Sequence, residues 1–274
     1  MGYDLIAFDM DGTILDTRKQ ILPSTLEAIR EAKAQGKTVA IATGRSPAMM
    51  MAHKEELAEI PYAICTSGAH IFSIPEDRIL KEQVFDPALV AKLHEAHQGM
   101  DVMLEIFSGR YNYLPADKMS CLERYGMAEF EKVFHEVGKI VPDLDEWLHV
   151  HAGEVTKYNL HPTCHDAGLK ILERVQEMGI PTEPAFSSGG TLEFSPLGVT
   201  KGNALKELCG LLGIPIERSI AVGDSGNDAD MLLAAGLGIA MGNATADVVE
   251  CADAVVADND HDGCAEAIRR YLLA

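Results

Sequence analysis

The sequence predicts an α/β protein that has a doubly wound parallel-sheet (Rossmann-like) core and an inserted α/β domain. Short apolar runs alternate with helical patterns at both ends of the 274-residue chain, as is typical of parallel strands joined by helices that cover both faces of a sheet. The middle of the chain departs from this pattern, because several strand patterns follow one another there around the only tryptophan, Trp147. We therefore expect a core formed by 1–84 and 196–274, with 85–195 as an inserted cap domain.

The first half of the core begins with an apolar strand, LIAFD, at 5–9. A helix is predicted over 23–36, because Ser24 and Glu27 have the spacing of a capping box and Gly36 ends the apolar pattern. Apolar strands are expected at 38–43 and 62–68, with a helix between them that opens with SPAMM.

The second half of the core repeats the alternation of helix and strand. Helices are predicted over 200–213, 227–236 and 244–252, and strands over 218–224, 237–241 and 252–257. The insert shows two longer helical patterns and strand patterns at 102–107, 110–114, 154–161 and 191–195. Strands that alternate with helices in both halves predict one sheet built from the two ends of the chain.

Composition restricts the partners of the protein. The 42 acidic residues exceed the 23 Lys and Arg residues, and the net charge of −19 disfavours binding to nucleic acid or to anionic membrane surfaces. No apolar stretch approaches the roughly 20 residues that span a bilayer, and six scattered cysteines without a CxxC pair are typical of a reducing compartment. We therefore expect a cytoplasmic protein that holds a small anionic substrate by local positive charge; the sequence does not indicate an oligomeric state.

Polar residues cluster where the predicted core strands end. Because ligands of open α/β sheets bind at the carboxyl ends of the strands, these clusters are expected to share one pocket. They consist of Asp9 with Asp11, Thr43 with Gly44 and Arg45, Lys201 at the start of a helix, and Gly223, Asp224, Asn227 and Asp228.

Asp9 and Asp11 repel each other unless a cation or a shared proton intervenes. Several carboxylates at one sheet edge are ligands suited to Mg²⁺, which also binds phosphate oxygens. Lys201 and the Thr43 hydroxyl would donate hydrogen bonds to a phosphoryl group. An ionised Asp9 could then attack phosphorus and form an aspartyl-phosphate.

The segments DMDGT at 9–13, ATGR at 42–45, GVTKG at 198–202 and GDSGNDADM at 223–231 resemble the motifs of the haloacid dehalogenase superfamily. Their order and spacing are similar to those of its Cof-type phosphatases, in which a large α/β cap is inserted between the second and third motifs. The resemblance implies that Asp9 is the nucleophile and Asp11 the general acid and base.

The same resemblance implies a metal site and a phosphate site. Mg²⁺ would be bound by Asp9, Asp224 and the backbone carbonyl of Asp11, while Asp228 would bind the metal or orient a water molecule on it. The residues expected at the phosphate are Gly12, Thr43, Gly44, Lys201, Asn227 and Arg45, of which Arg45 either contacts phosphate or only braces its loop.

The function expected is that of a Mg²⁺-dependent phosphatase of small phosphorylated metabolites. Sugar phosphates are the first substrate class, followed by pyridoxal phosphate and nucleotide monophosphates. A phosphomutase that uses the same aspartyl-phosphate and a non-catalytic metabolite-binding protein are the alternatives. Ser67 stands where many relatives have asparagine, so the substrate preference of any single relative is not transferred to this chain.

Histidines gather in one stretch of the insert, where they could suggest a zinc site. The spacing does not match a zinc-finger pattern, and His161 and His165 are expected to lie on either side of a helix start at Pro162. We interpret these histidines as surface or core residues and not as metal ligands. The potential ligands in this stretch are His149, His151, His161, Cys164 and His165.

Overall fold

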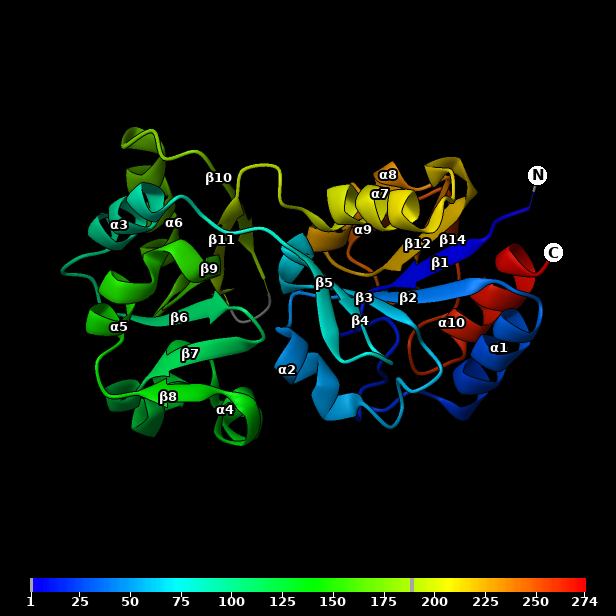
Figure 1. Ribbon diagram of the computed structural model, residues 1–274, viewed down its shortest axis with the longest axis horizontal. Helices are drawn as coiled ribbons and strands as arrows, with labels where there is room; N and C mark the ends of the chain where they lie inside the picture. Colours follow the sequence, from blue (N-terminus) through cyan, green and yellow to red (C-terminus); the bar gives the residue numbers. More distant parts are fainter. Residues whose placement is uncertain (1, 188–189) are drawn as a thin grey trace. The chain divides into compact units, whose positions relative to one another are not determined.

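The computed structural model describes residues 2–187 and 190–274, which form two compact units (Figure 1). Contacts within the chain assign Met1–Gly44, His53–Lys81 and Thr200–Ala274 to the first unit, and Arg45–Ala52 and Glu82–Val199 to the second. The domain boundaries expected from the sequence, with a core of 1–84 and 196–274 and an insert of 85–195, stay a prediction. Residues 1, 188 and 189 lie outside the described part of the chain.

The first unit contains an eight-stranded sheet in the order β14-β13-β12-β1-β2-β3-β4-β5. The six strands from β14 to β3 are parallel to their neighbours, and β4 is antiparallel to β3. The strands are β1 Leu5–Phe8, β2 Thr38–Ala42, β3 Tyr62–Cys65, β4 His70–Ser73, β5 Arg78–Glu82, β12 Ser219–Gly223, β13 Leu237–Ala240 and β14 Ala254–Val255.

Helices cover both faces of this sheet (Figure 1). One layer is formed by α7 Lys201–Leu212, α8 Ala229–Ala234 and α9 Ala246–Cys251, and the other by α1 Pro23–Ala34 and α10 Gly263–Ala267. Leu5 and Ala7 pack with residues of the first layer, whereas Ile6 and Phe8 alternate to the other face and are equally buried. The doubly wound parallel sheet expected from the apolar runs is therefore confirmed.

One local expectation for the first segment of the chain is wrong, and a second, the helix that opens with SPAMM, is confirmed. Helix α1 starts at Pro23 with Leu22 as its N-cap and has no side-chain cap, because the Ser24 hydroxyl donates instead to the Asp262 carboxylate. The SPAMM helix is a single turn, α2 Pro47–Met50, capped by the Ser46 side chain and followed by a short 3₁₀ segment.

The second unit is built on a six-stranded sheet in the order β10-β11-β9-β6-β7-β8. Its neighbouring strands are antiparallel except for β7 and β8. The strands are β6 Val102–Ser108, β7 Tyr111–Pro115, β8 Lys139–Val141, β9 Val155–Pro162, β10 Thr182–Phe186 and β11 Leu192–Pro196; its other helices are α3 Pro87–Ala96, α4 Glu131–Val137, α5 Leu144–His151 and α6 His165–Glu177.

Pro162 ends strand β9 and does not start a helix, so the predicted helix start at this residue is wrong. Helix α6 begins at His165, with Cys164 as its N-cap. None of the helices in the described part of the chain is both long and apolar enough to cross a bilayer.

Alternate residues of β6 face two different clusters. Val102, Leu104 and Ile106 pack against the apolar faces of α3, α5 and α6, while Met103 packs with Phe134 of α4 on the opposite side. This alternation gives the sheet one continuous apolar face. The side chains on its other face do not contribute to that cluster and need not be apolar.

His97 is a buried titratable group of the second unit. It is 7% exposed and its Nε2 lies 2.7 Å from the Tyr158 hydroxyl. Burial, and after it the charge of the neighbouring His94, lower the pKa of His97 to about 4. The folded protein therefore holds this imidazole neutral at pH values where the unfolded chain binds a proton.

We expect the free energy of unfolding to fall as the pH is lowered from about 6.5 to about 4, because only the unfolded chain binds a proton at His97 in this range. The difference between a pKa of 6.5 and one of about 4 corresponds to at most roughly 3–4 kcal/mol. Urea unfolding at several pH values, followed by Trp147 fluorescence in the same unit, measures it. The variant His97→Gln should lose this part of the pH dependence, and equal slopes for both proteins would contradict the prediction.

Candidate functional site

Asp9 follows β1 directly, at the carboxyl end of a parallel strand. Its backbone N–H donates to the Val222 carbonyl on the adjacent β12 over 2.9 Å, and its side chain is only 8% exposed. The carboxylate is therefore fixed at the centre of the sheet edge, where the topology brings ligands.

Lys201 is the cation of the site. It is the first residue of α7, whose N-cap Thr200 accepts a hydrogen bond from the Asn203 N–H. Its Nζ donates to Asp9 Oδ1 over 2.6 Å and to Asp228 Oδ1 over 2.7 Å, and all three side chains are buried. The ammonium group thus joins two carboxylates from opposite ends of the chain.

Asp228 is held by the turn that follows β12. Its Oδ2 accepts hydrogen bonds from the N–H groups of Asp224, at 3.0 Å, and Ser225, at 3.1 Å. Gly223 is required beside it, because a Cβ at this position would lie 2.4 Å from the Asp228 Cβ. The sequence GDSGND therefore folds so that Asp228 points back at the strand end.

Asp224 completes the cluster and contacts the loop that follows β1. The Thr13 hydroxyl donates to Asp224 Oδ1 over 2.7 Å. Gly12 has a φ of +84°, and a Cβ there would come within 2.5 Å of Asp224 Oδ2. The Asn243 side-chain amide donates to the Gly12 carbonyl over 2.8 Å and fixes this loop.

The pKa values of the cluster show an excess of negative charge. Burial raises the pKa of Asp9 well above its usual range, and the charges of Asp228 and Asp224 raise it further against the opposing effect of Lys201. Burial likewise raises the pKa of Asp224 to about 6, against the hydrogen bond from Thr13. For Lys201, burial alone would lower the pKa, but the carboxylates of Asp228 and Asp9 raise it overall.

The same three aspartates fit a divalent cation. Asp9, Asp224 and Asp228 each offer a carboxylate oxygen, and these oxygens lie within 4.8 Å of one another. A single ammonium group faces three carboxylates, which leaves negative charge that a bound cation would neutralise. Carboxylate oxygens are the ligands that Mg²⁺ prefers, so the donor set suits this metal.

A strained loop braces the site from the side of β3. Thr66 and Ser67 both have a φ of +54°, a conformation that such residues rarely adopt. The Ser67 N–H donates to the Thr43 carbonyl over 3.0 Å, and Thr43 donates its own N–H to Ile64. Gly68 packs so closely that a Cβ would lie 2.3 Å from the Thr200 carbonyl, next to Lys201.

The structure brings some of the predicted site residues together and leaves others apart. Asp9, Asp224, Asp228 and Lys201 meet. The Asp11 carboxylate instead pairs with Lys19 Nζ at 2.9 Å and is 39% exposed. The expected binding of a metal ion by the Asp11 backbone carbonyl stays a prediction.

The remaining predicted residues belong to loops. The Asn227 side-chain oxygen accepts a hydrogen bond from the Ser225 hydroxyl. Thr43 is buried, and Gly44 is the last residue of its segment of the first unit. Arg45 is the first residue assigned to the second unit. Their proposed roles at a phosphate remain predictions.

Sequence reasoning missed two residues that shape the cluster. Thr13 lies within DMDGT, and its hydroxyl fixes Asp224. Asn243 follows β13, and the rule that polar residues gather where parallel strands end could have identified it.

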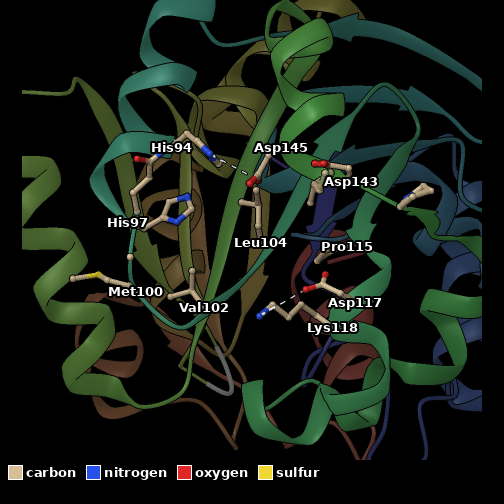
Figure 2. Close-up of a pocket in the computed structure, with 14 residues that line it drawn as sticks. His94, His97, Met100, Val102, Leu104, Pro115, Asp117, Lys118, Asp143 and Asp145 are labelled. Carbon is tan, nitrogen blue, oxygen red and sulfur yellow. Dashed lines mark ion pairs between the residues drawn. The ribbon is translucent and has the colours of Figure 1, made fainter.

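A cavity also lies entirely within the second unit. Figure 2 shows this space of about 570 Å³, lined by residues that include His94, His97, Leu104 and Asp145. Its two histidines already have partners, since both contact the Tyr158 hydroxyl and His94 lies 3.8 Å from Asp145. The acidic cluster, and not this cavity, has the properties of a reactive site.

The comparison with known families identifies one match. The sequence model of the family described as haloacid dehalogenase-like hydrolase matches residues 6–268. This range spans almost the whole chain and includes every residue of the acidic cluster.

Individual relatives are similar over their full length. The chain is 29% identical to the phosphatase YwpJ of Bacillus subtilis, with 98% of this chain and 99% of YwpJ covered. It is 30% identical to the 5-amino-6-(5-phospho-D-ribitylamino)uracil phosphatase YcsE of the same organism, with 98% and 96% covered. The solved structure of a haloacid dehalogenase-like hydrolase from B. subtilis superposes with a TM-score of 0.83 at 28% identity, over 97% of this chain and 99% of the other.

We expect Mg²⁺ to raise the free energy of unfolding, because it binds the folded cluster and not the unfolded chain. At a concentration of 100 times its dissociation constant the gain should be about 2.7 kcal/mol. Urea unfolding with Mg²⁺ and with excess chelator measures the gain. Asp224→Asn should reduce it, whereas Glu27→Gln, on an exposed carboxylate paired with Arg269, should not. Identical curves with metal and with chelator would show that the cluster binds no Mg²⁺.

Proposed function

The chain belongs to the haloacid dehalogenase-like hydrolases and is a phosphatase of that family, and we propose that it hydrolyses small phosphorylated metabolites through an aspartyl-phosphate on Asp9. The observation that carries this proposal is the buried contact of Lys201 with Asp9 and Asp228 beside Asp224. A nucleophilic carboxylate, a phosphate-binding ammonium group and metal-ligating carboxylates are the components that phosphoryl transfer to an aspartate requires.

Asp9 is the nucleophile in this proposal. Lys201 binds Oδ1 and holds the carboxylate in one orientation, so that Oδ2 can attack phosphorus. The alcohol oxygen leaves, and the phosphoryl group becomes bonded to Asp9. Lys201 and the Thr43 hydroxyl donate to the phosphoryl oxygens, where negative charge increases in the transition state.

Asp11 acts as the general acid and then as the general base. Its side chain is partly exposed and within reach of solvent, which suits a group that exchanges protons twice in each turnover. It donates a proton to the leaving alcohol and later accepts one from the water that hydrolyses the aspartyl-phosphate. Gly12, Gly44, Arg45 and Asn227 complete the proposed phosphate site.

Mg²⁺ is the proposed cofactor, bound by Asp9, Asp224, Asp228 and the Asp11 backbone carbonyl. The clustering of carboxylate oxygens supports this choice. When bound, Mg²⁺ would neutralise part of the charge of the phosphoryl group. Thr13 contributes by holding Asp224 through its hydroxyl.

Sugar phosphates and related polyol phosphates are the substrate class that we propose first. The name of the relative YcsE specifies a substrate that carries a 5-phospho-ribityl chain, which supports this class. Pyridoxal phosphate and nucleotide monophosphates follow. We also propose a cytoplasmic location, which the six free cysteines support.

The proposal is tested by a panel of phosphorylated metabolites, in which released phosphate is measured with Mg²⁺ and with excess chelator. We expect release that depends on Mg²⁺ and is fastest with sugar or polyol phosphates. Release of no phosphate from any ester, or full turnover in chelator, would contradict the proposal.

We expect Asp9→Asn and Asp11→Asn to fail in different ways. Asp9→Asn removes the nucleophile, so no phosphoprotein forms with any ester. Asp11→Asn keeps the nucleophile but lowers turnover of alkyl phosphates about 10²–10⁴-fold, because the leaving alkoxide is not protonated. Nitrophenyl phosphate needs no such proton, so with this ester the Asp11→Asn variant should give a burst near one equivalent per site and accumulate phosphoprotein.

Burst amplitude and hydroxylamine-sensitive phosphoprotein are the measurements that separate the two variants. Unfolding curves serve as the control that both variants are folded. A burst from Asp9→Asn, or folded Asp11→Asn without phosphoprotein, would show that the roles are assigned wrongly.

A further inference from the structure

The loop that follows β1 carries Asp11 and is attached to segments from the last part of the chain. Residues 10–21 contain a local turn, in which the buried Asp16 carboxylate accepts hydrogen bonds from two N–H groups of the same loop, both at 2.9 Å. This turn closes the loop on itself but does not attach it to another segment. Beside Asp11, the attachment comes from two side chains more than two hundred residues away in the sequence, Asn243 and Asn259.

Asn243 follows β13 and binds the residue next to Asp11. Its amide nitrogen donates to the Gly12 carbonyl over 2.8 Å, and its amide oxygen accepts from the Asn259 N–H over 3.1 Å. Because the first partner only accepts and the second only donates, the orientation of the amide group is fixed. Asn243 therefore joins the segment after Asp11 to the segment that contains Asn259.

Asn259 follows β14 and binds a second backbone neighbour of Asp11. Its amide nitrogen donates to the Leu15 carbonyl over 2.9 Å, and Leu15 forms an isolated β-bridge with Asp11. Gly12 is thus the covalent neighbour of Asp11, and Leu15 is its backbone-pairing neighbour. Each of them is held by one of the two asparagine side chains, which we call the asparagine pair.

The side chain of Asp11 has a weaker attachment of its own. Lys19 Nζ lies 2.9 Å from Asp11 Oδ1, but the two side chains are 52% and 39% exposed, and ion pairs between exposed groups contribute little free energy. Lys19 also belongs to the same loop, so this ion pair moves with the loop and does not fix it. The direction of the Asp11 side chain therefore depends on the position of its backbone, which the asparagine pair holds.

Attachment of the loop for stability alone would not require the asparagine pair. The Asp260 carboxylate already binds the Thr17 N–H at 2.9 Å and the Thr17 hydroxyl at 3.1 Å, and so attaches the loop further from Asp11. The asparagine pair adds contacts at the two backbone neighbours of Asp11. Its amide groups are neutral, so they supply these donors without changing the charge of the loop that carries Asp11.

We propose that Asn243 and Asn259 are positioning residues, which hold the backbone around Asp11 so that its carboxyl group can transfer protons. This inference rests on the proposed function, in which Asp11 is the general acid and base, and all the residues concerned belong to the first unit. A displacement of about 1 Å can lower a rate about 10²-fold. Loss of either asparagine should therefore resemble a weaker form of Asp11→Asn, with the nucleophile Asp9 intact.

The test separates the two chemical steps in the full chain. Wild type, Asn243→Ala and Asn259→Ala are mixed with a smaller amount of 4-nitrophenyl phosphate at saturating Mg²⁺, and rapid quenching gives the rate constants for formation and decay of the phosphoprotein. Nitrophenolate leaves without a proton, so formation does not need one from Asp11. In decay, the water oxygen bonds to phosphorus, the bond to Asp9 breaks and Asp11 accepts the proton of the water.

We expect decay to be slowed about 10-fold in each variant, and formation to be nearly unchanged. A smaller amount of folded protein would not produce this result, because only folded molecules become phosphorylated and first-order decay does not depend on their number. The matched control is Asp260→Ala, which breaks the contact between the same two segments at Thr17. It should leave both rate constants unchanged.

Three outcomes would overturn this inference alone. They are unchanged decay in either asparagine variant, slowing of formation as large as that of decay, and the same slowing of decay in Asp260→Ala. A wild type that forms no phosphoprotein would overturn the proposed function as well.

Discussion

The buried ammonium group of Lys201 is the interaction on which the site depends. It contacts Asp9 from the N-terminal strand and Asp228 from the turn after β12, two segments separated by more than two hundred residues. An unpaired carboxylate in either position would be costly to bury. The cation therefore joins the two halves of the sheet at the carboxyl ends of its strands, where we propose that the chemistry takes place, and the arrangement of these charged groups follows from the topology of parallel strands.

Close backbone approach holds this ion pair in place. Gly68 packs on the carbonyl of Thr200, the residue before Lys201, and Gly223 lies against Asp228. Neither position has room for a Cβ, so small residues set the spacing between the loops. The strained backbone at Thr66 and Ser67 directly precedes Gly68, which agrees with the common finding that backbone strain is stored at functional sites.

Local sequence patterns predicted those strands and site residues that depend on neighbouring residues in the sequence. Apolar runs such as Leu5–Phe8 identified the parallel strands, and their ends identified Asp9 and Lys201 as neighbours. Strand β5, Arg78–Glu82, was missed because it is largely exposed and charged. The cap of α1 was predicted wrongly because Ser24 bonds to a residue far away in the sequence. The sequence pattern did not predict that Glu105 is buried, because long-range packing decides which face of β6 meets the helices.

The alternation along β6 and β9 separates two tasks within single strands. Val102, Leu104 and Ile106 pack against the helices on one face, while Glu105, which alternates with them, takes part in hydrogen bonds on the other face. Mutations on this other face can therefore accumulate in a lineage with little loss of the hydrophobic core. A sheet of this kind can therefore change on one face in evolution while the fold is inherited unchanged.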